Sequence, residues 1–296
     1  MPRSRRSRPT RVPSLRFSAI GTDWQVDTLL PVDADLEARL HSRIDEFDRT
    51  YSRFRGDSLV STVAEAPGRY RFPDDASRLF DLYDGLFDST DGAVTPLVGR
   101  ALEQLGYDAR YSLTRRGPGM PAPRWADEVA REGSTLVTRS PVLIDVGAAG
   151  KGYLVDLVGE LLHEGGVDAF LIDASGDLLV SGPEPTGVGL EHPFDPSMAI
   201  GEVTLTNRSI CASGSNRRVW GEGLHHILDG RTGEPTRDVI ATWAIADSAL
   251  LADGLATALF FADPTELART FDFEWVRMFS TGVAERSVDL PGRLFS

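Results

Sequence analysis

Cysteine and lysine are almost missing from this sequence of 296 residues, which contains one of each, Cys211 and Lys151. A single cysteine excludes an internal disulfide and a zinc site built from cysteines. It also carries no information about the redox compartment. Because lysine is so rare, arginine supplies the rest of the 31 basic side chains. The position that keeps a lysine is therefore a candidate for a specific role.

Long apolar runs and a positive net charge are missing as well. No segment approaches the ~20 apolar residues that a membrane-spanning helix needs, so we expect no membrane span. The net charge of −13 argues against binding to nucleic acid, because neutralising phosphates requires clustered cations. No Gly-x-Ser-x-Gly, Walker or Gly-x-Gly-x-x-Gly motif occurs. This disfavours a Ser-His-Asp hydrolase and the common nucleotide-binding loops.

The first 16 residues are rich in arginine and proline, and no apolar run of the kind found in signal peptides follows them. We interpret residues 1–16 as a disordered basic tail and expect a cytoplasmic protein. The remainder, residues 17–296, contains no internal repeat and no long low-complexity linker. A hydrophobic content of 41% suffices for a substantial core, so we predict a single domain here.

Residues 144–182 organise the chain. A strand end is followed by a glycine turn with Gly147, Gly150 and Gly152, then by a helix that Gly165 stops, and then by a hairpin. The helix is predicted from apolar residues that share one face at helical spacing, namely Leu154, Leu157, Val158, Leu161 and Leu162. Lys151 lies in the turn, where glycines let a ligand approach the backbone closely. A compact ammonium is favoured there over a planar guanidinium, and the alternative is a lysine retained by chance on a solvated turn.

Before this stretch the pattern predicts two strand pieces in residues 15–30, which meet at Gly21 and Thr22, and helices over residues 33–51 and 74–90. Tyr51 and Phe54 belong to a polar loop, where they pack either against a ligand or against the core. Residues 90–99 form a loop before a short helix that ends near Gly106. We expect an exposed excursion over residues 107–135 that contains Trp125, and then a strand over residues 136–144.

After this stretch we expect a loop over residues 182–196 and strand within residues 200–211. A polar turn covers residues 212–218, and a strand that contains two adjacent histidines runs into a turn at residues 225–235. A further strand over residues 241–246 precedes a helix over residues 248–262. The turns at residues 147–152, 173–177 and 212–218 are all able to present backbone N–H groups to phosphate oxygens.

Two pairs of side chains are candidates for a metal site and for a catalytic base. Asp253 and Thr257 are four residues apart on an apolar helix, so their oxygens lie on one face and suit Mg²⁺ or Ca²⁺. The alternative is that the Thr257 hydroxyl bonds back to the Asp253 carbonyl. His225 and His226 are adjacent on a strand, so they face opposite sides. One is a candidate base and the other is expected to be solvated, whereas a zinc pair is disfavoured.

The order of these segments resembles the ApbE family of FAD:protein FMN transferases. The resemblance spans residues 18–262 and rests on segments that follow one another as Gly21-Thr22, Tyr51-Ser-Arg-Phe, Asp91-Gly-Ala-Val-Thr-Pro, Asp145-Val-Gly-Ala-Ala-Gly-Lys-Gly-Tyr, Ser175-Gly-Asp177, Ala212-Ser-Gly with Arg217, His226-Ile-Leu-Asp-Gly-Arg-Thr-Gly and Ala252-Asp-Gly-Leu-Ala-Thr257. The chain departs from the family's usual pattern at several of them. Thr95, for example, stands where the family has an aspartate.

The resemblance implies an ApbE-like (T-fold-like) α+β domain with mixed β-sheets flanked by helices. It also implies an enzyme that binds FAD with Mg²⁺ and links FMN to a Ser or Thr hydroxyl of an acceptor protein, releasing AMP. Further hypotheses are hydrolysis of FAD to FMN and AMP, and a flavin-binding module without catalysis. The implied site contains His226 as the base, Ala148 (backbone carbonyl), Asp253 and Thr257 as metal ligands, and Ile20, Phe54, Ala93, Val94, Thr95, Asp145, Lys151 and Ile227 as FAD contacts.

Overall fold

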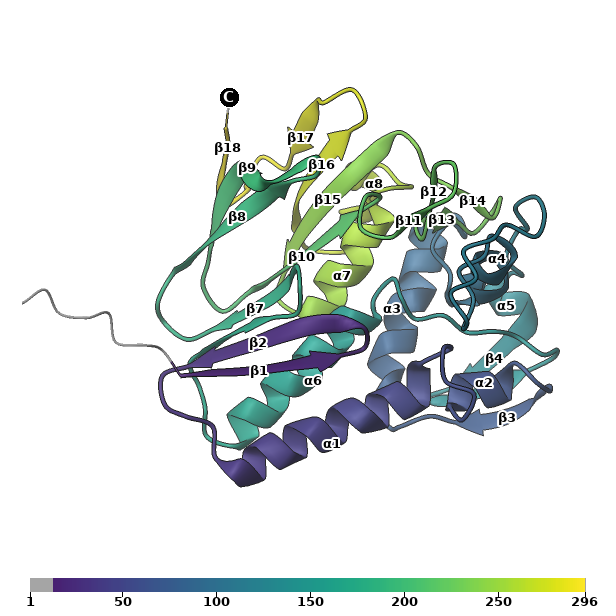
Figure 1. Ribbon diagram of the computed structural model, residues 1–296, viewed down its shortest axis with the longest axis horizontal. Coiled ribbons are helices and arrows are strands. Elements are labelled where there is room, and N and C mark those ends of the chain that lie inside the picture. Colours follow the sequence, from purple (N-terminus) through teal and green to yellow (C-terminus); the bar gives the residue numbers. More distant parts are fainter. Residues whose placement is uncertain (1–12, 296) are drawn as a thin grey trace, which may run out of the picture.

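A large sheet runs through the computed structural model, which describes residues 13–295 (Figure 1). Each of its strands pairs antiparallel with its neighbours. In spatial order the strands are β1 (Ser14–Ala19), β2 (Thr22–Thr28), β6 (Phe170–Asp173), β7 (Asp177–Ser181), β10 (Ser209–Gly214), β15 (Val239–Ala246), β16 (Glu274–Phe279) and β17 (Ala284–Arg286).

Smaller sheets surround the large one. The recorded strand pairings between Ser14 and Leu294 are all antiparallel, so the expectation of mixed sheets is corrected in this respect, while the α+β class is confirmed. These sheets are β18 (Gly292–Leu294) with β9 (Asp195–Leu205) and β8 (Thr186–His192); β3 (Gly68–Arg71) with β5 (Thr135–Thr138) and β4 (Val129–Glu132); β11 (Val219–Trp220) with β12 (Leu224–His225); and β13 (Leu228–Asp229) with β14 (Glu234–Pro235).

Strand β15 shows how the large sheet is buried on both faces. Ala244 and Ala246 belong to the core on the helical side, whereas Trp243 and Ile245 belong to a second core. The alternation follows from the two-residue period of a strand. The second core also contains residues of β8 and β9, so the three-stranded sheet closes this face. Because both faces of β15 are buried, its sequence is a nearly continuous apolar run.

The helices gather on the other face of the sheet (Figure 1). Helix α7 packs against β10 and β15, and it contacts α6 and α3, while α1 lies against α6. In α1 the predicted apolar stripe is buried, and the Asp33 carboxylate caps the helix by accepting from Leu36 N at 2.8 Å. The helices are α1 (Ala34–Tyr51), α2 (Leu59–Val63), α3 (Ala76–Ser89), η1 (Pro96–Val98), α4 (Gly99–Gln104), α5 (Trp125–Glu128), α6 (Gly150–Glu164), α7 (Ala249–Ala258) and α8 (Pro264–Leu267).

Helix α6 starts earlier than the sequence predicts, because Gly150, Lys151 and Gly152 already form its first turn. The glycine at 152 has a packing reason. A Cβ atom there would clash with the Ala249 carbonyl oxygen at the start of α7. The missing side chain thus lets α6 and α7 approach closely, which brings Lys151 next to α7.

Three other expectations are corrected. Most of the excursion over residues 107–135 is exposed as expected, but Trp125 is buried at 4% exposure and donates from Nε1 to Asp84 Oδ1 at 2.6 Å, so the segment packs onto the core at this residue. The strand expected over residues 136–144 is confined to β5. Residues 182–196 contain β8 and the start of β9 instead of a loop. The glycines and prolines of this segment indicated a loop, but the segment forms a β-hairpin because it covers the large sheet.

The expected N-terminal tail lies mostly outside the described residues, and its last residues, Ser14 to Arg16, belong to β1. The predicted hairpin around Gly21 is confirmed as β1 and β2, whose register pairs Ala19 with Thr22. Over residues 13–295, each helix is too short or too polar to cross a membrane.

Candidate active site

One pocket of about 990 Å³ opens where the tip of the β1–β2 hairpin, the start of α6, the second half of α7 and the segment after β10 meet. Every residue of the predicted site lines it. These residues are Ile20, Phe54, Ala93, Val94, Thr95, Asp145, Ala148, Lys151, His226, Ile227, Asp253 and Thr257. The fold therefore gathers segments that are spread over almost the whole chain.

The three expected metal ligands lie together. The Thr257 hydroxyl donates to the Ala148 carbonyl oxygen at 3.2 Å, so the alternative bond back to the Asp253 carbonyl is not the one formed. Asp253 is 4% exposed, and its Oδ2 accepts from Gly152 N at 2.9 Å. Burial, and then the nearby Asp177, raise the pKa of the Asp253 carboxyl well above its usual range.

This donor set fits Mg²⁺. A carboxylate, a carbonyl oxygen and a hydroxyl are hard ligands, and Mg²⁺ is typically held by one or two carboxylates together with substrate phosphates and water. Within residues 13–295 no group of three or more His, Cys, Asp or Glu side chains is arranged to hold a metal. A cation beside Asp253 would therefore retain coordination positions for ligand oxygens. It would also stabilise the charged form of this carboxyl.

Lys151 forms an ion pair inside the protein. Its ammonium lies 2.9 Å from Asp177 Oδ2 and donates to the Ala174 carbonyl oxygen at 3.0 Å. The Asp177 side chain has no exposed surface, whereas 21% of the Lys151 side chain remains exposed at the pocket. Asp177 raises the pKa of Lys151 against the opposing effect of burial, so the ammonium stays charged. The lysine at position 151 therefore has an acidic partner, Asp177, which belongs to the separate Ser175-Gly-Asp177 motif.

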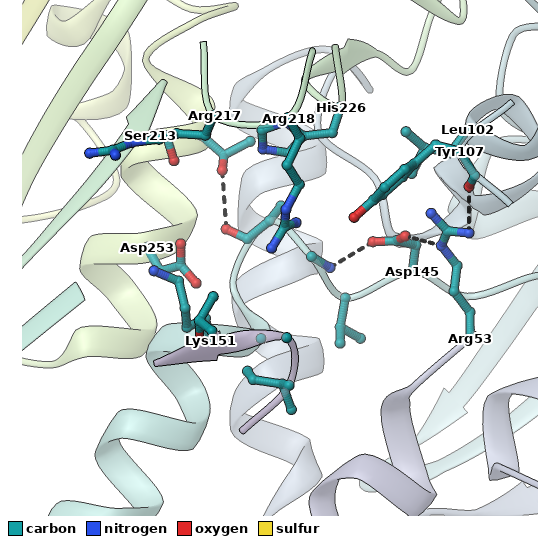
Figure 2. A pocket seen from close by; sticks show the side chains of 18 of the residues that line it. Arg53, Leu102, Tyr107, Asp145, Lys151, Ser213, Arg217, Arg218, His226 and Asp253 are labelled. Atoms are coloured by element: carbon teal, nitrogen blue, oxygen red, sulfur yellow. Dashed lines mark hydrogen bonds and ion pairs between the residues drawn. The ribbon is translucent and has the colours of Figure 1, made fainter. Parts of the chain in front are cut away.

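Arg53 holds Asp145 in place, and sequence reasoning missed it. The Arg53 guanidinium is buried, pairs with the Asp145 carboxylate, and donates from Nη1 to the Tyr107 carbonyl oxygen at 2.8 Å (Figure 2). The other Asp145 oxygen accepts from Gly147 N at 2.7 Å. Arg53 also lies 4.3 Å from the centre of the Phe54 ring. The sequence signal was the Arg in Tyr51-Ser-Arg-Phe, but its partner is 92 residues away.

Aromatic rings form one wall of the pocket. Phe54 stacks on Tyr111 with ring centroids 5.2 Å apart, and Tyr107 stacks on Trp220 at 5.4 Å. Tyr51 is buried in the core at 4% exposure and also borders the pocket. Packing against the core therefore applies to Tyr51, while both aromatic residues are placed where a ligand could reach them. The remaining rings come from segments without a recognisable sequence motif.

The rest of the predicted flavin contacts are held by backbone geometry. Ile20 has φ 46° at the hairpin tip, a conformation that is strained for a β-branched residue. Ala93 accepts from Gly230 N at 2.8 Å, and Val94 donates to the Thr90 hydroxyl at 3.0 Å. The Thr95 hydroxyl accepts from Leu97 N at 3.2 Å and so caps η1. Ile227 is buried beside the pocket at 5% exposure.

The two histidines lie in different surroundings, but they do not share a strand as expected, because β12 ends at His225 and His226 follows in a bend. The histidine outside the pocket is also not solvated, which corrects the second expectation. His225 is buried, accepts at Nδ1 from Ile227 N at 3.3 Å and donates from Nε2 to the Thr236 carbonyl oxygen at 2.8 Å. His226 lines the pocket, and its buried Nδ1 has no hydrogen-bond partner among the described residues. Burial, and then the Arg218 guanidinium, lower the pKa of His226 to about 3.

The chain is similar to known proteins over most of its length. Residues 20–276 match the ApbE family. A FAD:protein FMN transferase of Klebsiella pneumoniae is 29% identical over 77% of this chain and 76% of its own length, and one of Escherichia coli is 23% identical over 89% and 82%.

Solved structures show the same fold. The ApbE protein of Thermotoga maritima superposes with a TM-score of 0.82 at 23% identity, covering 94% of this chain and 97% of its own. The flavin transferase ApbE of Vibrio cholerae gives 0.76 at 20% identity, covering 95% and 98%. The family match extends over most of the chain, from the first hairpin to β16. This protein therefore belongs to the ApbE family.

Proposed function

We propose that this protein transfers FMN from FAD to a Ser or Thr hydroxyl of an acceptor protein and releases AMP. The observation that carries the proposal is the meeting of hard oxygen ligands, a fixed ammonium and a neutral histidine in one pocket. A volume of about 990 Å³ lies at the upper end for small-molecule sites, which suits a dinucleotide. The relatives named as FAD:protein FMN transferases support the same reaction.

The transfer is a phosphoryl displacement. The acceptor oxygen forms a bond to the phosphorus on the riboflavin side of FAD, and the bond from this phosphorus to the bridging oxygen breaks. AMP leaves with the electron pair, and the proton of the hydroxyl passes to His226. Such reactions depend mainly on positioning and on stabilising charge. Lys151 contributes a cation whose place is set by Asp177.

Ala148, Asp253 and Thr257 are the residues that would hold Mg²⁺. When bound, the ion would offset the negative charge of the pyrophosphate. Asp253 has a second function in the protein itself, because it caps the first turn of α6 through Gly152 N. Its carboxylate is thereby held at the junction of α6 and α7, beside the ammonium of Lys151.

His226 is neutral at pH 7, which is the form that a base requires, but a pKa of about 3 gives it little affinity for a proton. Part of this depression comes from the positive charge of Arg218. The anionic pyrophosphate of bound FAD would compensate this charge, so the pKa of His226 should rise in the complex. The base would thus gain proton affinity when the substrate is present.

Incubation with FAD, Mg²⁺ and a candidate acceptor protein tests the proposal. We expect flavin fluorescence that stays with the acceptor band through denaturing electrophoresis, together with an equal amount of AMP. Free FMN and AMP without labelled protein would indicate hydrolysis instead. Binding of intact FAD with neither product would indicate a module without catalysis. Replacing the acceptor Ser or Thr with alanine is the matched control and should abolish the label.

A further inference from the structure

The pocket contains one guanidinium that is not paired. Four lysine and arginine side chains line it, and three of them form ion pairs. These pairs are Arg53 with Asp145, Lys151 with Asp177 at 2.9 Å, and Arg217 with Glu191 at 2.9 Å. The fourth is Arg218. Among residues 13–295, no carboxylate lies within 4.0 Å of the Arg218 guanidinium. Its positive charge is therefore available to a ligand.

Arg218 is directed into the pocket. It follows β10 in the segment that leads to β11. Figure 2 shows its side chain extending from the side of His226 into the middle of the pocket, with Asp253 and Lys151 on one side and Asp145 on the other. Its charge acts on His226 and on Tyr107, lowering the pKa of the histidine and opposing the rise in that of the tyrosine.

We propose that Arg218 binds the pyrophosphate of FAD and that this contact selects ligands with phosphate groups over the bare flavin. This inference rests on the proposed function and names a further binding residue for it. A guanidinium matches two phosphate oxygens with parallel N–H donors, and such charge-assisted hydrogen bonds are among the strong ones. The paired cations are less suited to this role, because each is already compensated by a carboxylate.

The contact also serves the chemical step. When the bond to the bridging oxygen breaks, negative charge develops on the phosphate of AMP, and a cation close to it stabilises the transition state. In the free enzyme, burial and then this same cation lower the pKa of His226. Arg218 therefore links the arrival of the anionic substrate to the proton affinity of the base.

The test measures binding of FAD, ADP and riboflavin to three forms of the full chain with Mg²⁺ present. These are the wild type, Arg218→Gln and Arg217→Gln, which removes the adjacent but paired arginine. We expect Arg218→Gln to weaken FAD and ADP binding about 10- to 100-fold and to leave riboflavin binding unchanged. Arg217→Gln should weaken FAD and ADP binding less than Arg218→Gln does, because Arg217 is paired with Glu191. Arg218→Lys should recover part of the lost affinity, because it restores charge without the paired donors.

Thermal unfolding of each variant shows that the comparison is made on folded protein, and we expect unchanged midpoints because Arg218 is exposed. Equal FAD and ADP affinity in wild type and Arg218→Gln would overturn the assignment of Arg218 while the proposed function stands. An equal loss of riboflavin affinity would overturn it too, because it would indicate a general change in the pocket. A wild type that binds neither FAD nor ADP would overturn both proposals.

Discussion

Replacing Lys151 with methionine leaves a buried carboxylate without its cation. Asp177 has no exposed side-chain surface, and Lys151, at 2.9 Å, is its ion-pair partner. Over the described residues no other Lys, Arg or His nitrogen lies within 4.0 Å of this carboxylate. Methionine keeps most of the length and apolar character of the lysine stem, so the substitution removes mainly the charge.

Breaking a buried ion pair by removing one partner costs about 3–5 kcal/mol, because the remaining charge is uncompensated. We therefore expect Lys151→Met to lower the free energy of unfolding by about this amount, a large part of the about 5–15 kcal/mol of a typical domain. Asp177→Asn should cost less, because the ammonium that remains is 21% exposed and can be solvated from the pocket. The double variant contains no unpaired charge, so it should be more stable than Lys151→Met alone.

The loss should also depend on pH. Burial raises the pKa of the Asp177 carboxyl in the folded protein, and losing the lysine removes the largest opposing effect. The folded variant then binds more protons than the unfolded chain, so its free energy of unfolding falls as pH rises above about 4, the ordinary pKa of aspartate. Urea unfolding of the four proteins at pH 5 and pH 8 measures both effects. Additive losses in the double variant, or a larger loss at pH 5 than at pH 8, would refute the reasoning.

Asp253→Asn should lower the rate of transfer, and high Mg²⁺ should recover part of it, because the charge that holds the ion is gone. A titration of transfer activity with Mg²⁺ checks this, and an unchanged Mg²⁺ concentration at half-maximal activity would remove Asp253 from the metal site. His226→Ala should lose transfer by about 10²–10⁴ and retain FAD binding. His225→Ala should lower the melting temperature through the lost bond to the Thr236 carbonyl, with turnover of the folded fraction retained, and the reverse outcome would assign the base to His225. Burial raises the pKa of Asp156 to about 6, so its contribution to the free energy of unfolding falls as pH rises from about 4 to 6. Asp156→Asn should lack this fall in unfolding measured at pH 4 and pH 7, and parallel curves for the two proteins would contradict it.

Local patterns predicted much of this protein. The apolar stripe of α1, the helix α6 stopped at Gly165, the β6–β7 hairpin and the helix that carries Asp253 all follow from short-range spacing, and the structure confirms them. The order of the motifs also indicated the residues that meet in the pocket. Such features are readable because side-chain periodicity within one element determines which face is buried.

Contacts between residues that are far apart in the sequence became visible only in the tertiary structure. The pairing of Arg53 with Asp145 joins residues 92 positions apart, and β8 forms as a strand because its hairpin covers the second core. The same is true of Trp125, which the sequence placed on the surface, and of the unpaired state of Arg218 beside a paired Arg217. Each depends on which elements pack together, because burial removes a group from water and only a partner brought by another element can compensate it.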